Sequence, residues 1–349
     1  LRLSLRPGAA PKPPPGAPAT PAKAEAQPAI AGTMPKAGRR RALCVGINRY
    51  PTAPLHGCVA DATLWASTLQ SLGFENPLTL FDERATLKGI TQALTELVSS
   101  SAPGDVIVFQ YSGHGTQLPD IDGDEAQGDT PGKDEAICPY DFATGAFLID
   151  DDIADVFRRL PHGVNLTCFI DCCHSGTISR FAVGSPPPSG RRADERPRYI
   201  VATPEMIEAH RQFRAGMGGT RAVTAGSGGL SRMKEVLFTA CLSSEVAWES
   251  EGQGEFTRRA IPVLRQGVGR LSNREFEQQV IAAFGASPRQ HARLYCDPSC
   301  EHNVILSPIA SAASAAALQP TASRADADTG VAVGQRVEVL LREVQKQAE

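Results

Sequence analysis

Continuous apolar runs recur along the chain, separated by stretches in which apolar residues return every three or four positions. The runs are rich in β-branched and aromatic residues, as expected of strands covered on both faces of a parallel sheet; they span 41–48, 77–81, 105–111, 165–170 and 235–241. Helical spacing is found at 58–72, 86–99, 257–265 and 273–284. Because strands and helices alternate, the pattern predicts right-handed βαβ units and an α/β fold, with a mostly parallel sheet between helices.

The stretch at 86–99 is the most regular of these helical patterns. Thr86 stands where an N-cap residue belongs, because its hydroxyl oxygen could accept from a free amide of the first turn. The apolar positions that follow lie on one helical face: Leu87, Ile90, Leu94, Leu97 and Val98.

Three segments differ in composition from these periodic regions. Residues 1–38 are rich in Pro, Ala and Gly, and are predicted to be a disordered arm. Residues 180–233 are predicted to be a flexible linker with one short helix near 204–213. Residues 309–349 form an Ala/Ser-rich tail whose last apolar stripe predicts a docked or oligomerising helix, which leaves the oligomeric state open. Two foldable regions remain, at 39–179 and 234–308.

Composition narrows the class of protein. The 349 residues carry a formal net charge of -3 and no sustained basic stripe, which argues against nucleic acid as a partner. The chain contains no apolar run of eighteen residues and no secretory h-region, so no membrane association is expected. Nine cysteines are an odd number, and several lie in predicted strands, which fits a reducing compartment. We therefore expect a cytoplasmic protein.

Two of the predicted strands end in residues suited to thiol chemistry. Tyr111-Ser-Gly-His-Gly-Thr116 closes one run and Asp171-Cys-Cys-His-Ser-Gly176 closes another. Sites in parallel sheets gather at the carboxyl ends of the strands. A thiol is mostly protonated at neutral pH and needs a nearby imidazole, so Cys173 is the candidate nucleophile and His114 the candidate base. The amides of Gly115 and Cys173 are the candidate oxyanion donors.

Strand alternation distinguishes the two adjacent cysteines. If extended geometry persists to the strand end, Asp171 and Cys173 share one face and Cys172 points to the other. By the same count Ser112 and His114 share a face. The pattern links these pairs but does not tell which face holds the site.

These motifs resemble the two signatures of metacaspases and of their bacterial relatives, the orthocaspases. His56-Gly-Cys-Val-Ala-Asp-Ala62 is similar to a third element of that family. Strong similarity covers about 40–178 and weaker similarity covers about 234–308. The resemblance implies a caspase-like fold, with a large-subunit region at 39–179 and a small-subunit region at 234–308 in one chain. It also implies a cysteine endopeptidase acting on protein or peptide substrates with Arg or Lys at P1.

The resemblance extends to the residues of the site. It implies a dyad of His114 and Cys173, and a pocket for the basic P1 side chain lined by Asp61, Asp171, Ser112 and Cys58. Paired carboxylates suit a guanidinium, whereas an acidic P1 residue would be repelled.

The predicted linker is rich in arginines that such an enzyme could cut after. We therefore carry self-processing in the linker as a hypothesis. The candidate residues are Arg191, Arg192, Arg196, Arg198, Arg221 and Arg232.

Acidic residues are dense at 120–134 and again at 150–152, which invites a calcium hypothesis. The spacing does not fit an EF-hand. The resemblance implies a calcium site at Asp134, Asp150 and Asp151, but Arg180 stands near the position of a further family ligand and would repel a cation. We therefore expect activity that requires no cofactor. In the simplest alternative, Asp150 to Asp152 cap a helix beginning at Ile153.

Two other functions stay open from sequence. One is a non-catalytic caspase-fold scaffold or signalling protein that binds partners through the Pro-rich arm and the terminal helix; the other is a calcium-gated protease.

Overall fold

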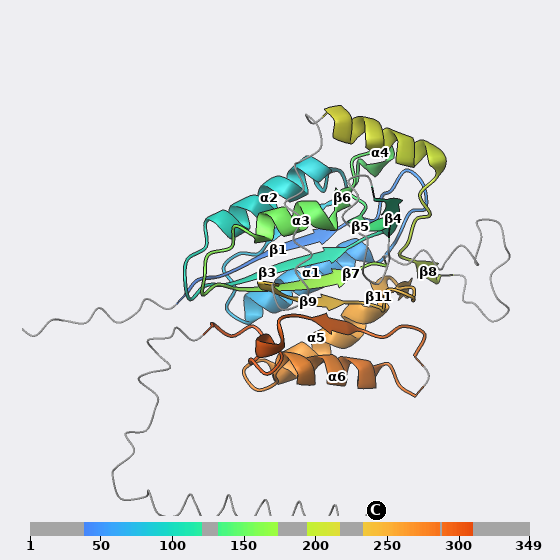
Figure 1. Cartoon of the computed structure of the whole chain (residues 1–349). Helices are drawn as coiled ribbons and strands as arrows, with labels where there is room; N and C mark the ends of the chain where they lie inside the picture. The colour runs from blue at the N-terminus through green and yellow to red at the C-terminus, as the bar shows by residue number, and fades with distance from the viewer. Residues whose placement is uncertain (1–37, 121–131, 174–193, 217–232, 287, 310–349) are drawn as a thin grey trace, which may run out of the picture. The chain divides into compact units, whose positions relative to one another are not determined.

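A six-stranded sheet lies at the centre of the folded region (Figure 1). The structure is a computed structural model that describes residues 38–120, 132–173, 194–216, 233–286 and 288–309. Across the sheet lie, in order, β12 (Arg293–Tyr295), β9 (Glu235–Thr239), β7 (Asn165–Asp171), β3 (Val106–Ser112), β1 (Arg40–Gly46) and β2 (Leu78–Phe81). All neighbours are parallel except β12, which pairs antiparallel with β9. The predicted α/β fold with a mostly parallel sheet is confirmed.

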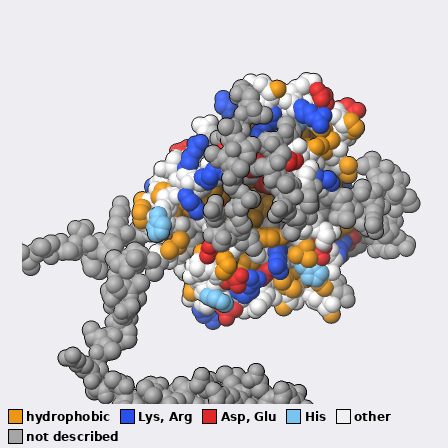
Figure 2. Space-filling model, in the orientation of Figure 1, with side chains coloured by type: hydrophobic (Ala, Val, Ile, Leu, Met, Phe, Trp, Pro, Cys, Tyr) orange, Lys and Arg blue, Asp and Glu red, His pale blue; other side chains and the backbone are white. Residues whose placement is uncertain are grey.

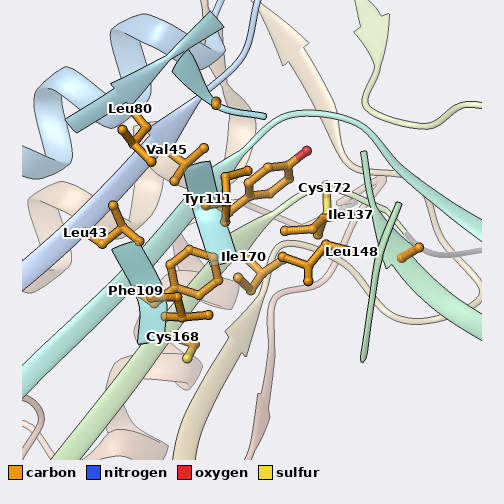
Figure 3. Packing of buried hydrophobic residues seen from close by; sticks show 14 of the residues in the cluster. Leu43, Val45, Leu80, Phe109, Tyr111, Ile137, Leu148, Cys168, Ile170 and Cys172 are labelled. Carbon is orange, nitrogen blue, oxygen red and sulfur yellow. The ribbon is translucent and has the colours of Figure 1, made fainter. Parts of the chain in front are cut away.

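Helices cover both faces of this sheet. One face packs on α2 (Leu87–Ser99) and α3 (Asp150–Phe157), and the other on α1 (Cys58–Ser71), α5 (Glu255–Gly267) and α6 (Asn273–Ala283). Strand residues alternate between the two cores: Leu43 and Val45 point to the first, and Ala42 and Cys44 to the second. Figure 3 shows part of the first core, where side chains of β1, β3 and β7 meet those of the small strands beside them.

An aromatic stack crosses the second core. Trp65 of α1 stacks on Phe169 of β7 at 4.3 Å between ring centroids, and Phe169 stacks on Phe238 of β9 at 5.3 Å. Phe276 of α6 meets Phe238 edge-on at 5.0 Å. These rings are all buried, so the predicted regions 39–179 and 234–308 share one core.

Two small antiparallel sheets lie beside the central one. The first contains β4 (Gly115–Pro119), β5 (Lys133–Ile137) and β6 (Leu148–Ile149), and the second β8 (Arg196–Pro197), β10 (Trp248–Ser250) and β11 (Gln253–Gly254). The helix α4 (Pro204–Gly216) follows β8, and short 3-10 turns occupy Asp82–Arg84, Phe142–Thr144 and Pro298–Cys300. The sequence analysis did not predict the strands of these two small sheets, most of which have only two or three residues and therefore show no period.

The long periodic elements lie where the sequence placed them, within a few residues. Thr86 caps α2 as predicted, since its Oγ1 accepts from the amide of Gly89 at 3.1 Å. The predicted helix near 204–213 is present as α4. The predicted arm at 1–38, apart from Gly38, and the predicted terminal helix lie outside the described residues. Within the part that is described, no helix has the length and apolar character needed to cross a membrane.

Charged side chains of both signs are interspersed over the described surface in Figure 2.

Candidate active site

The ends of β3 and β7 meet at one edge of the sheet. Their parallel register places Ser112 beside Asp171, and the chain then continues to His114 and Cys173. Gly115 is held close to the second strand end, because a Cβ there would lie 2.0 Å from the carbonyl oxygen of Cys173. Only glycine permits this approach, so the histidine motif and the cysteine motif are packed directly against each other.

His114 is buried and oriented by a backbone carbonyl. Its Nε2 lies 2.7 Å from the carbonyl oxygen of Ala53, and its ring packs against Tyr50 with centroids 4.7 Å apart. A carbonyl can only accept, so Nε2 carries the hydrogen and Nδ1 the lone pair. Nδ1 is buried and has no hydrogen-bond partner among the described residues. Burial lowers the pKa of His114 to about 4, against the opposing effect of the Ala53 bond, so the imidazole is a neutral acceptor at pH 7.

Cys173 and Cys172 point to opposite faces of the sheet, as alternation predicted. Cys172 belongs to the first core, where Figure 3 shows it beside Ile137, and Cys173 belongs to the second. The Sγ of Cys173 accepts from the amide of Ala247 at 2.6 Å. This leaves Cys173 on the face that also holds Asp171.

A pocket of buried carboxylates lies on that face, and it contains an arginine of the same chain. The guanidinium of Arg198 lies 2.5 Å from Asp61, 2.9 Å from Asp171 and 3.4 Å from Glu249, measured between nitrogen and carboxylate oxygen. All four side chains are at most 2% exposed. An arginine buried this deeply is stable only because its charge is paired.

Backbone and hydroxyl donors hold Asp61 and Asp171 in place. Asp61 lies in the first turn of α1, where the helix dipole favours a negative charge, and accepts from the amide of Gly254 at 3.1 Å. Asp171 accepts from the hydroxyl and the amide of Thr257, at 2.9 Å and 3.3 Å. A Cβ on Gly254 would lie 2.3 Å from Asp171 and 2.5 Å from the guanidinium of Arg198, so the pocket wall needs glycine here.

Glu249 is the third carboxylate, and the sequence analysis missed it. It lies in β10 and accepts from the amides of His56 and Gly57 at 2.7 Å and 3.1 Å. These amides precede α1, so Glu249 joins the small-subunit region to the first helix. A strand of three residues is too short to show a period, so the pattern of apolar residues could not point to Glu249. The sequence indicates only that this glutamate lies a few residues after the predicted strand at 235–241.

The two polar residues expected in the pocket lie beside it. The Sγ of Cys58 is 3.8 Å from Glu249. The Oγ of Ser112 accepts from Gln110 at 2.8 Å. Among the described hydrogen bonds neither side chain contacts Arg198, so their expected place in the pocket stays a prediction.

Burial and the arginine act in opposite directions on the carboxylates. Burial raises the pKa of Asp61 to about 7 although the Arg198 charge lowers it, and burial likewise raises the pKa of Asp171. For Arg198, burial favours the neutral form, but the surrounding acids raise its pKa well above its usual value. The pocket therefore favours a cation, because each buried carboxylate costs free energy to keep ionised when no cation is beside it.

The two candidate oxyanion donors point at one oxygen. The amides of Gly115 and Cys173 both donate to the carbonyl oxygen of Arg198, at 3.1 Å and 3.2 Å. Two amides that converge on a carbonyl next to a cysteine have the geometry that stabilises a developing oxyanion.

Comparison with known proteins agrees with this arrangement. Residues 40–181 match the family model described as metacaspase, peptidase C14 domain. This part of the chain is similar to the metacaspase peptidase domain. Metacaspase-2 of Trypanosoma brucei brucei is 41% identical over 158 residues, which are 41% of this chain and 44% of that protein. Metacaspase-1 of Arabidopsis thaliana is 40% identical over 152 residues, 40% of each chain.

The match covers less than half the length of these metacaspases. A crystal structure of protein GSU0716 from Geobacter sulfurreducens aligns with 78% of this chain and 100% of its own, at a TM-score of 0.60 and 24% identity. That likeness concerns the fold alone: the two chains share the arrangement of sheet and helices.

The acidic residues of the candidate calcium site lie apart from the carboxylate pocket. Asp134 is in β5, and Asp150 and Asp151 are in the first turn of α3. The alternative in which Asp150 to Asp152 cap a helix beginning at Ile153 is wrong in its boundary, because α3 begins at Asp150. The carboxylates lie within its first turn, where the helix dipole favours them. In the described ranges, no group of three or more acidic, histidine or cysteine side chains could hold a metal ion. Arg180 lies outside those ranges, so activity without calcium stays a prediction.

Proposed function

We propose that the chain is a cysteine endopeptidase of metacaspase type that cleaves peptide bonds after Arg or Lys. The observation that supports this best is the carboxylate pocket, which binds a guanidinium next to two amides and a cysteine. Asp61 and Asp171 accept from the two terminal nitrogens of one arginine, and Glu249 adds a third acceptor. Lysine would fit as a point charge, with fewer hydrogen bonds.

In the proposed mechanism, the thiol of Cys173 loses its proton to Nδ1 of His114 as its sulfur attacks the carbonyl carbon after Arg or Lys. The oxyanion that forms is held by the amides of Gly115 and Cys173. His114 then gives the proton to the departing amine, and the C–N bond breaks to leave a thioester on Cys173. Water hydrolyses the thioester with His114 as base, which restores the thiol and releases a carboxylate.

The carbonyl of Ala53 orients the base throughout this cycle. It holds the Nε2 hydrogen and thereby keeps the lone pair on Nδ1. The neutral imidazole can accept the thiol proton, and the protonated form is costly in the buried site, which favours prompt transfer to the leaving amine.

The test is hydrolysis of matched peptides with Arg, Lys or Asp at P1, assayed after incubation of the protein, by the wild type, Cys173→Ala and His114→Ala. Arg and Lys peptides should be cut and the Asp peptide left intact, and each substitution should lower the rate by roughly 10⁴-fold or more. Parallel assays with calcium and with chelator test the expectation that no cofactor is needed. If no peptide is cut under any condition, the result favours the alternative function, a non-catalytic scaffold or signalling protein.

A further inference from the structure

An arginine outside the carboxylate pocket contacts the residue three positions before Arg198. We propose that Arg289 is a specificity-determining residue, which selects substrates with an acidic side chain at P4, the position three residues before P1. This rests on the proposed function, because it extends the substrate specificity of the same site.

The strand β10 fixes where the residues before P1 would lie. Arg198 fills the P1 pocket, and its amide donates to the carbonyl oxygen of Ala247 at 2.9 Å. The chain before it pairs antiparallel with β10, so that Pro197 lies opposite Trp248. A substrate that adds to a strand edge in this way takes its affinity from the main chain and its specificity from the side chains beside the strand. In this register P2 corresponds to Pro197 and P4 to Glu195.

Arg289 contacts both the P4 position and the strand that would carry the substrate. Its Nη1 lies 2.9 Å from Oε2 of Glu195, whose side chain is only 14% exposed. Its guanidinium carbon lies 4.9 Å from the centroid of the Trp248 ring, which opposes P2. A planar guanidinium can stack on an aromatic face and still donate to a carboxylate with its edge. Arg289 is therefore placed to recognise an acid at P4.

The residue that follows Arg289 fixes its backbone to the site. Gln290 is fully buried, and its side chain accepts from the amide of Trp248 at 3.0 Å. The same side chain donates to the carbonyl oxygen of Ala240 at 3.0 Å. A side chain carried on a fixed backbone loses less conformational freedom when a ligand binds, which favours selectivity.

The other carboxylate that pairs with Arg289 in the described part of the chain is more distant. Glu255 lies 3.8 Å from Nη2 of Arg289. It is already paired with Arg259 and accepts from the hydroxyl of Ser250. The closest acidic partner of Arg289 is therefore the side chain at the P4 position. A lysine at P4 would instead meet a like charge.

The experiment measures kcat/KM for acetylated peptides of the form X-Ala-Pro-Arg, with Glu, Gln or Lys as X. The enzymes are the wild type, after incubation, and the Glu195→Gln/Arg198→Gln chain, in which no resident charge occupies either position. The Glu peptide should be cut about fivefold faster than the Gln peptide, as expected for one ion pair between partly exposed groups, and the Lys peptide should be cut slowest. The peptide Ala-Glu-Pro-Arg, with its acid at P3, should show no such gain.

Substitutions in the Glu195→Gln/Arg198→Gln chain test the role of Arg289 directly. Arg289→Gln should bring the ratio of the Glu to the Gln peptide to about one, and Arg289→Glu should make the Lys peptide the best of the three. Arg258→Gln is the matched control, because Arg258 pairs with Glu251 at 2.8 Å, and it should keep the preference for Glu. Circular dichroism checks that each variant is folded.

Three results would overturn this proposal and leave the protease intact. They are active chains that cut the Glu and Gln peptides equally, a preference for Glu that survives Arg289→Gln, and an equal loss of that preference in Arg258→Gln. Failure of the wild type and of every variant to cut any Arg peptide would instead count against the proposed function itself.

Discussion

The two parts of the chain that meet at the site are held in different ways. The ends of β3 and β7 lie in a sheet covered on both faces by apolar side chains, so their positions follow from burial. Residues 196–200 are held by main-chain hydrogen bonds and by one guanidinium among three carboxylates. Burial fixes the first region whatever sits in the site. The second depends on a few polar contacts, with Ile200 in the first core and Tyr199 against the second, and it is therefore more sensitive than the first region to a change of charge.

The largest expected effect is on the core. Phe169→Ala removes a ring stacked between Trp65 and Phe238, and should lower the free energy of unfolding by about 3–5 kcal/mol. Pro197→Ala in the second region should lower it by less than about 1 kcal/mol. The free energy of unfolding of both variants is measured by denaturant unfolding in the Cys173→Ala chain, which lacks the proposed nucleophile and so should not cut itself. Equal losses of this free energy would mean that residues 196–200 are part of the core.

The next effect is on the pocket. Asp171→Asn leaves the guanidinium of a substrate without one of its two closest acceptors, and should lower kcat/KM for Arg peptides by roughly 100-fold. Ser112→Ala is the matched control, because Ser112 lies beside Asp171 in register but hydrogen-bonds to Gln110. Both are assayed in the Arg198→Gln chain, where the pocket is open. A control as impaired as Asp171→Asn would show that the loss comes from disturbed packing.

The buried imidazole gives a dependence of stability on pH. The pKa of His114 is lowered by burial to about 4, so between pH 4 and 6.5 the unfolded chain binds the extra proton and stability rises with pH. The contribution is on the order of 3 kcal/mol and is lost as the pH falls through this window. Asp61, whose raised pKa is about 7, acts in the opposite direction. The free energy of unfolding of the Cys173→Ala chain is compared with that of the Cys173→Ala/His114→Gln chain at several pH values, and the difference gives the contribution of the histidine. A difference that does not change with pH would contradict a buried neutral imidazole.

The smallest expected effect is at the third carboxylate. The amides of His56 and Gly57 bond different oxygens of Glu249, so Glu249→Gln keeps an acceptor for only one of them, and it removes a charge 3.4 Å from the guanidinium. It should lower kcat/KM for Arg peptides by about tenfold, mostly through KM. Steady-state kinetics in the Arg198→Gln chain measures this. A loss as large as that of Asp171→Asn would place Glu249 among the main P1 contacts.

The sequence predicted the first region well and the second poorly. Long apolar runs and helical stripes fixed the central strands and helices, and strand alternation placed Cys172 and Cys173 on opposite faces because each strand is buried. Asp61 and Asp171 came from the family resemblance.

Glu249, β8 and the position of Arg198 could not be predicted, because they depend on pairing between strands of two or three residues far apart in the chain. Composition marked 180–233 as a flexible linker. Within the described part of it, Arg198 is fully buried, since specific charge pairing replaces the apolar surface that composition measures.

The position of β9 between β7 and β12 decides what would hold the protein together if the backbone between β7 and β9 were cut. Five residue pairs join β7 to β9, and Phe169 stacks on Phe238 across that boundary. A break in the backbone between these strands would produce two polypeptides that still share one sheet and one buried core. Their separation would require unfolding of that sheet, so the cleaved product would behave as a heterodimer whose subunits come from a single gene product and stay together on dilution.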